Sequence, residues 1–149
     1  MRFHLIDRVD AWEPFRSVRA RKLTSYSEEY WETTADGPIM PPPLVLEALC
    51  QAGTWLVMLS TDVRKRAALL SVGSVDFLGD VRPGDVLELH GSVDSMGDEV
   101  AVVSGQVVVE GRSVLEAKDI MCVLIDASDL EDVENTRRML KLLTRTGAE

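Results

Sequence analysis

The sequence predicts an α+β domain in which a curled antiparallel sheet wraps around one long apolar helix, with an extra helix at the C-terminus. Three observations support this fold class. Residues 44–60 would be apolar on nearly every face of a helix. The segments that follow change to a period of two, which is typical of strands. The end of the chain then returns to a helical period beside many charges.

Composition limits the possible classes of function. The chain has 149 residues and is 46% hydrophobic, which suits one domain with its own core. Its formal charge of −9 argues against a nucleic-acid partner, because phosphate contacts require clustered Lys and Arg. The two cysteines, Cys50 and Cys122, lie in apolar runs and match neither a disulfide framework nor a metal-ligand spacing. We therefore expect neither a metal nor another cofactor.

The same sequence predicts a cytoplasmic protein with no membrane contact. Charges close to the N-terminus argue against a signal peptide. The longest apolar segment, residues 44–59, contains Glu47 and Gln51 and is shorter than the roughly 20 residues that span a bilayer.

Proline marks the approach to the long helix. Residues 17–23 are compatible with a short strand, and residues 37–43 are rich in proline, which holds the backbone extended. Pro43 suits the first helical position, where its missing N–H costs nothing. We therefore expect helix from there to residue 60, where Leu, Ala and Met are abundant.

The polar exceptions on this helix share one face. Glu47, Gln51 and Thr54 are spaced i, i+4 and i+7. A carboxylate among apolar neighbours is unfavourable unless another group pairs with it or a polar cavity opens there. Glu47 is therefore the first candidate for a functional carboxylate. The alternative is a carboxylate that is simply favoured by the dipole at the start of the helix.

Four long strands are expected after the helix. They are residues 68–77, 86–93, 99–109 and 114–125. Pro83-Gly84 suits the centre of a type II turn, and the glycines within 96–98 and 110–112 suit hairpin loops. Connections this short join antiparallel neighbours.

The tail has the pattern of a surface helix. Residues 128–131, Ser-Asp-Leu-Glu, have the form of a capping box. Residues 129–144 then carry an apolar stripe, which predicts an amphipathic helix docked on its own domain or on a partner. We therefore divide the chain into a domain of residues 1–127 and a C-terminal helix and tail of residues 128–149.

Several short stretches occur in the order of one known family, across roughly residues 4–125. They are Leu5-Ile6-Asp7-Arg8-Val9, Pro38-Ile39-Met40-Pro41, Leu46-Glu47-Ala48-Leu49-Cys50-Gln51-Ala52, Val75-Asp76-Phe77 with Val81-Arg82-Pro83-Gly84-Asp85, and Met121-Cys122. Together they resemble the bacterial 3-hydroxyacyl-acyl-carrier-protein dehydratases. These enzymes have the hotdog fold, a sheet wrapped around a central helix.

The resemblance implies a homodimer of two hotdog domains, with acyl tunnels along the shared interface. It also implies dehydration of a 3-hydroxyacyl thioester to the trans-2-enoyl product. In that family the acid–base pair is a histidine before the proline-rich segment and the acidic residue of the central helix, from opposite subunits. Glu47 stands at the acidic position, with Gln51 as a further candidate. An amide N–H near the start of the helix holds the thioester carbonyl.

The sequence departs from this pattern at two positions. An ungapped alignment on residues 38–41 places Thr33 at the histidine position, with Asp36 as a further candidate in the same loop. Pro42 stands where the family has glycine, and it has no N–H to donate. Threonine cannot act unaided as an acid or base, and each such group typically contributes 10²–10⁴-fold.

Other residues complete the expected site. His4 and His90 are the only histidines, and we expect both to be packed or solvent-facing rather than catalytic. The basic run Arg64-Lys65-Arg66 is either a solvated corner between helix and strand or a docking site for an acidic carrier protein. The residues expected to bind the substrate are Met40, Leu44, Phe77 and Leu78.

Three functions remain open, each with an acyl thioester on acyl carrier protein or coenzyme A. In the first, Glu47 faces a histidine supplied by a related subunit, so that a heterodimer forms the dehydratase site. In the second, the chain is a non-catalytic subunit that binds acyl chains or an acyl carrier protein. In the third, Glu47 and Gln51 hydrolyse the thioester, with the N–H of Leu44 as the amide donor.

Overall fold

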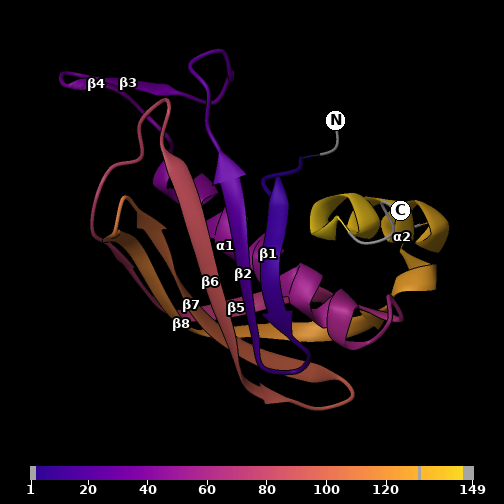
Figure 1. Ribbon diagram of the computed structural model, residues 1–149. Helices are drawn as coiled ribbons and strands as arrows, with labels where there is room; N and C mark the ends of the chain where they lie inside the picture. The colour runs from indigo at the N-terminus through magenta and orange to yellow at the C-terminus, as the bar shows by residue number, and fades with distance from the viewer. Residues whose placement is uncertain (1–2, 131, 146–149) are drawn as a thin grey trace.

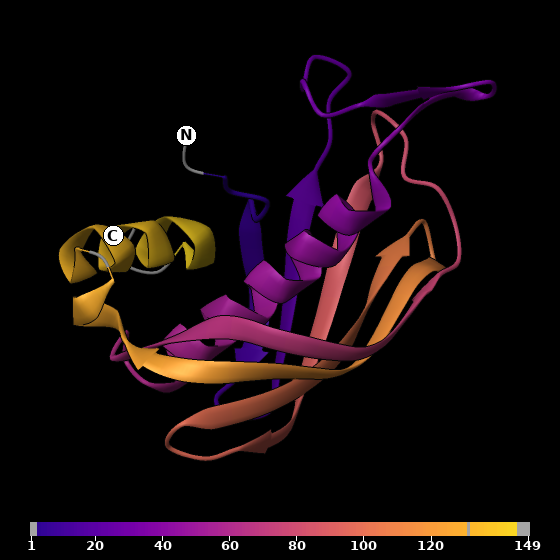
Figure 2. The same ribbon diagram turned by 180° about the vertical axis from the view of Figure 1, so that it is seen from behind.

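The computed structural model describes residues 3–130 and 132–145. A six-stranded antiparallel sheet in the order β1-β2-β6-β7-β8-β5 curls around helix α1, and β3 and β4 form a separate hairpin (Figures 1 and 2). The elements are β1 Arg8–Glu13, β2 Ser17–Leu23, β3 Glu32–Thr34, β4 Gly37–Ile39, α1 Pro42–Ser60, β5 Lys65–Phe77, β6 Val86–Met96, β7 Val100–Val109, β8 Arg112–Asp126, the 3₁₀ turn η1 Ala127–Asp129, and α2 Val133–Thr144.

Helix α1 is the centre of the fold and confirms the predicted class. It contacts every strand of the main sheet, and residues such as Val45, Ala48 and Leu56 are buried in the core. By length and composition alone the helix could cross a membrane, but half of that window is buried inside the domain, as in a core helix. The helix begins at Pro42, one residue earlier than predicted.

The four predicted strands are all present. Three of them are longer than expected, because the sequence pattern fades at their ends, and β7 begins one residue later than expected. Gly84 has φ +93° and the N–H of Asp85 donates to the carbonyl of Arg82 over 3.0 Å, which closes the predicted turn. Glu110 and Gly111 both have positive φ, as in a two-residue hairpin. The pairing register shifts along β5, β6, β7 and β8, and such bulges increase the twist that curls the sheet.

A pair of glycines lets the sheet approach α1 closely. Gly91 on β6 is paired with Gly105 on β7. A Cβ atom at Gly105 would lie 2.9 Å from Leu49 Cδ1 and would also collide with the backbone oxygen of His90. The absence of a side chain at Gly105 therefore sets how tightly the helix and sheet pack.

Helix α2 docks on its own domain. Leu143 is buried with the main core, and Arg137 Nη1 lies 2.9 Å from Asp62 Oδ1. The predicted capping box is wrong, because the helix begins at Val133, where the side chain of Asp132 accepts the N–H of Glu134 over 3.0 Å. The fourth residue of the predicted box, Glu131, lies outside the described residues.

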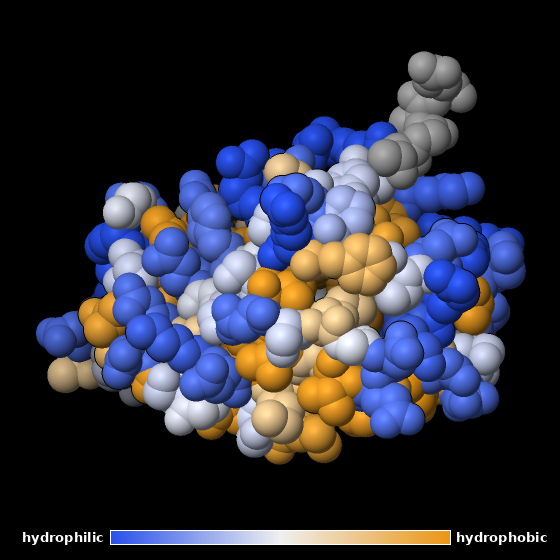
Figure 3. All heavy atoms as spheres, turned by 90° about the horizontal axis from the view of Figure 1, so that it is seen from below, coloured by the Kyte–Doolittle hydropathy of each residue, from blue (hydrophilic) through white to orange (hydrophobic). Residues whose placement is uncertain are grey.

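The outer surface of the curled sheet is not uniformly polar. Figure 3 shows apolar side chains gathered in the middle of the face seen from below, with hydrophilic side chains around them. Large exposed apolar residues on the strands include Leu70 on β5, Val100 on β7 and Met121 on β8. β5 ends the strand order, so one edge of this long strand has no partner strand within the described residues.

Substitution of Gly105 by alanine is expected to destabilise the fold. The added methyl group collides with backbone and with Leu49, and overpacking of this kind costs about 1–3 kcal/mol. Urea denaturation measures the change in the free energy of unfolding. Gly97→Ala is the matched control, because its Cβ meets nothing closer than 3.8 Å. Equal stability of the two variants would contradict the role of Gly105.

Candidate functional site

Glu47 is held by the side-chain amide of Gln51, one helical turn further along α1. Gln51 Nε2 donates to Glu47 Oε1 over 3.0 Å. The same nitrogen donates to the carbonyl of Phe3 over 3.1 Å, and Gln51 Oε1 accepts the N–H of Leu5 over 2.8 Å. Glu47 and Gln51, on the predicted polar face of the helix, therefore form a hydrogen-bonded network that also fixes the N-terminal segment to α1.

Beside this network lies a cavity of about 600 Å³. The cavity lies against α1. Its other walls come from the N-terminal segment, the start of β5 and α2, which flank α1 on this side of the domain (Figure 2). Polar and apolar groups share its wall. Its lining includes His4, Glu47, Cys50, Gln51, Arg66 and Met139. The predicted cavity beside Glu47 is thus present within a single chain.

A narrow apolar space of about 30 Å³ lies next to this cavity, beneath α1. The two spaces share Cys50, Thr54, Ala67 and Leu69 as lining residues. Its other walls come from β7 and β8, including Ile120 and Cys122. A narrow apolar surface therefore adjoins the cavity of Glu47.

The Cys50 thiol also lines the cavity, and it is not a nucleophile at neutral pH. Burial, the nearby carboxylate of Glu47 and Cys122 together raise the pKa of Cys50 to about 12. A thiolate is needed for nucleophilic attack. Among the described residues no group of three potential metal ligands is found either. Within the described part of the chain, the other titratable or charged side chains that line the cavity are those of His4, Glu47 and Arg66.

Thr33 and Asp36 lie on the β3–β4 hairpin, which projects away from the rest of the domain (Figure 1). Both residues are exposed, and the carbonyl of Asp36 accepts a hydrogen bond from Arg82 Nη1 over 2.9 Å. Neither lines the cavity of Glu47. Within one chain the structure does not bring these predicted catalytic residues together, so their roles stay predictions.

The four predicted substrate-binding residues are also dispersed. Met40 is packed in the core and 1% exposed, whereas Phe77 and Leu78 are exposed at the far end of β5. Leu44 is half-buried in the first turn of α1. Its N–H donates to the carbonyl of Pro41 over 2.9 Å, so the predicted free amide donor at Leu44 is wrong. Three consecutive prolines, Pro41 to Pro43, precede Leu44 and have no N–H, so the N–H of Leu44 is the first available one and closes the first turn of the helix.

The three side chains of the basic run have different surroundings. Lys65 Nζ is paired with Asp126 Oδ1 at 2.7 Å, and Arg64 Nε donates to the carbonyl of Thr61 over 3.0 Å. Arg66 lines the cavity of Glu47 instead. Successive residues of a strand point to opposite faces, which separates the side chains. Docking of a carrier protein at this run stays a prediction.

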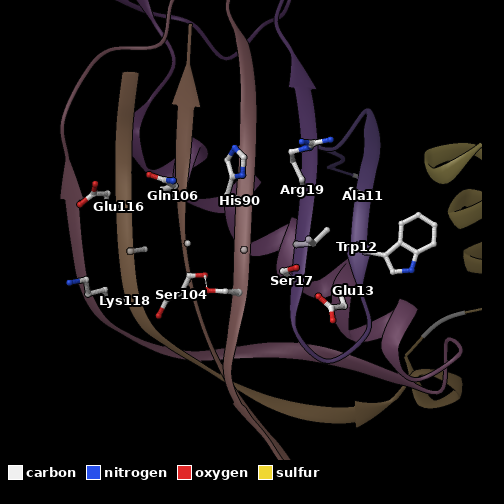
Figure 4. Close-up of a pocket in the computed structure, with 15 residues that line it drawn as sticks. Ala11, Trp12, Glu13, Ser17, Arg19, His90, Ser104, Gln106, Glu116 and Lys118 are labelled. Carbon is white, nitrogen blue, oxygen red and sulfur yellow. Dashed lines mark hydrogen bonds between the residues drawn. The ribbon is translucent and has the colours of Figure 1, made fainter. Parts of the chain in front are cut away.

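The two histidines have different surroundings. His90 lies in a row with Arg19, Gln106 and Glu116 on the outer face of the sheet (Figure 4), and its Nε2 is 3.3 Å from Glu88 Oε2. His4 lines the same cavity as Glu47. Sequence reasoning passed over His4 because no local pattern shows that the N-terminal segment crosses α1 near Gln51.

The chain is similar to known proteins in sequence and in fold. It matches the FabA-like domain over residues 1–118. It is 34% identical over 132 residues to a 3-hydroxyacyl-[acyl-carrier-protein] dehydratase FabZ of a Nitratiruptor species, covering 83% of this chain and 88% of that protein. It is 37% identical over 130 residues to the FabZ of an Anaeromyxobacter species, covering 83% and 82%.

Solved structures support the fold. The smu.793 protein of Streptococcus mutans UA159 bound to acetyl CoA superposes with a TM-score of 0.64 at 20% identity, covering 83% of this chain and 92% of that chain. This likeness shows the hotdog fold alone. The family match and the FabZ relatives show more: the chain belongs to the FabA-like family, beside the 3-hydroxyacyl-[acyl-carrier-protein] dehydratases.

Proposed function

We propose that this protein binds 3-hydroxyacyl thioesters in the cavity beside Glu47 and dehydrates them to trans-2-enoyl thioesters in the cytoplasm. The observation that carries the proposal is the carboxylate of Glu47, fixed by Gln51 at the wall of a cavity of about 600 Å³. The FabZ relatives, named as 3-hydroxyacyl-[acyl-carrier-protein] dehydratases, supply the reaction class. The acyl group arrives on acyl carrier protein or coenzyme A.

Dehydration needs two groups, and Glu47 is one of them. A base must take the proton from C2, and an acid must protonate the hydroxyl that leaves C3. Thr33 cannot supply the second group, and the hairpin that carries it does not reach the cavity of its own chain. A related subunit with a histidine in its hairpin would complete the site in a heterodimer. The wall of the cavity offers a second candidate, the imidazole of His4.

The free edge of β5 is the surface on which we propose that two chains pair. The strand runs from Lys65 to Phe77, is at the end of the sheet, and exposes Leu69 and Leu70, which are 51% and 59% accessible. A long apolar edge strand is a template for pairing with another strand. The cavity of Glu47 is lined by residues of the same strand, so a second subunit at this edge would lie beside it.

Hydrolysis of the thioester has less support, because the FabZ relative is 34% identical to this chain, whereas a structure named as a thioesterase is only 20% identical. Hydrolysis also passes through a tetrahedral oxyanion, which needs preorganised donors worth roughly 2.7–4 kcal/mol each. Pro42 and Pro43 have no N–H, and the N–H groups of Leu44 and Val45 both donate to the carbonyl of Pro41. The start of α1 therefore offers no amide to an oxyanion. The third alternative is a non-catalytic binding role, in which the thioester binds without turnover.

Substitution of Glu47 by glutamine is expected to lower kcat by about 10²–10⁴-fold, because an amide cannot transfer the proton. Conversion of 3-hydroxyacyl-coenzyme A substrates to enoyl thioesters, followed by mass spectrometry, measures the rate. Glu116→Gln, on the outer face of β8, is the matched control and should retain full activity (Figure 4). Unchanged turnover in Glu47→Gln would contradict the proposal. Binding of the thioester by the wild-type protein without turnover would indicate the non-catalytic role.

The Cys50 thiol is expected to resist alkylation at pH 8. Because its pKa is raised to about 12, roughly 10³-fold less thiolate is present than in an unperturbed thiol, and the rate of reaction should rise tenfold per pH unit beyond pH 9. Modification by iodoacetamide, located by mass spectrometry, gives the rate for Cys50. The same residue in urea-unfolded protein is the control. Equal rates in the folded and unfolded chains would show that the thiol is not buried beside a carboxylate.

Pairing at β5 is expected to fail when a charge replaces an apolar edge residue. Leu70→Lys should shift the sedimentation velocity profile from dimer to monomer, because a buried lysine without a partner is unfavourable at an interface. Leu142→Lys on α2 is the matched control, since Leu142 is 72% exposed and distant from β5 in sequence. A wild-type chain that sediments as a monomer, or a dimer that persists in Leu70→Lys, would exclude this interface.

A further inference from the structure

His4 is held beside the cavity by hydrogen bonds on both sides of it in the chain. The carbonyl of Phe3 accepts from Gln51 Nε2 over 3.1 Å, and the N–H of Leu5 donates to Gln51 Oε1 over 2.8 Å. Leu5 and Ile6 are then buried in the core, with 3% and 6% exposure. The backbone at His4 is therefore tied to α1, although the residue lies close to the start of the chain.

The same amide also donates to Glu47 Oε1 over 3.0 Å. One side chain thus holds both the carboxylate and the backbone that carries His4, and both residues line one cavity. We infer that His4 is the second acid–base group of the site and that it acts with Glu47 of the same chain. This inference rests on the proposed dehydration and would make a histidine from another subunit unnecessary.

The chemistry balances with these two groups. The carboxylate of Glu47 takes the proton from C2, and the C–H electron pair forms the C2–C3 double bond. The C3–O bond breaks as the imidazolium of His4 gives its proton to the leaving hydroxyl, which departs as water. The resulting carboxylic acid of Glu47 returns its proton to the neutral imidazole of His4, directly or through water. The thioester is converted to the enoyl product with no oxidant, reductant or other reactant.

His4 suits this role better than His90. Imidazole is the side chain that ordinarily changes charge near neutral pH. His90 lies on the outer face of the sheet beside Glu88, whereas α1 packs on the inner face. Among the described residues of the cavity wall, the other titratable or charged groups are Glu47, Cys50 and Arg66.

The test is loss and chemical rescue of turnover. In the full-length protein, His4→Ala should lower kcat for 3-hydroxybutyryl-coenzyme A by about 10²–10⁴-fold, with KM changed by less than about threefold. Free imidazole added to His4→Ala should restore at least a tenth of the lost rate, because the cavity has room for it. Imidazole should not restore Glu47→Gln. The matched control, His90→Ala, should keep the wild-type rate and show no response to imidazole.

Each other outcome has a distinct meaning. Full activity of His4→Ala together with loss in Glu47→Gln would overturn the role of His4 and leave the proposed function in place. Loss in His4→Ala with no response to imidazole and a raised KM would overturn it too, because the residue would then only shape the cavity. Activity that appears only after a related subunit is added would overturn it in favour of the composite site. Absence of turnover by the wild-type protein under every condition would overturn both the proposed function and this inference.

Discussion

The hydrogen-bonded amide of Gln51 is the interaction on which the site depends. A half-buried amide is unfavourable unless its donors and acceptor are satisfied, and here the partners come from two distant parts of the chain. The network ties the N-terminal segment across α1 and gives Glu47 a donor at the same time. Without Gln51 the N-terminal segment would lose the contacts on both sides of His4, and the carboxylate would lose its orientation.

The position of α1 depends on close packing with the sheet. Gly105 lets Leu49 approach β7 directly, so one face of the helix is sealed against strands. The opposite face, which carries Glu47 and Gln51, is left toward the cavity and the free edge of β5. The same helix therefore has an apolar face that packs on the sheet and a polar face that lines the cavity. The curl of the sheet determines which face is covered by strands.

The prolines at the start of α1 leave no free backbone N–H there to bind a substrate oxygen. Leu44 and Val45 are the first residues of the helix with N–H groups, and both donate to the carbonyl of Pro41. Hydrolysis and removal of the C2 proton both build charge on the thioester carbonyl oxygen, and neither reaction has a free amide at the start of α1. Glu47 lies further along the helix, where Gln51 holds it in place.

The sequence by itself determined the fold class, because apolar periodicity, proline and glycine act through local sterics and burial. Short motifs in the order of the 3-hydroxyacyl-acyl-carrier-protein dehydratases indicated the family by resemblance. It also determined that Glu47 and Gln51 share a face, since helical spacing needs no tertiary information. The sequence did not determine the extent of the strands, the bond that occupies the N–H of Leu44 or the start of α2 at Val133, because these depended on which backbone groups found partners. Only the tertiary structure brought His4 to the cavity of Glu47, because that arrangement joins segments more than forty residues apart and rests on hydrogen bonds that leave no periodic trace.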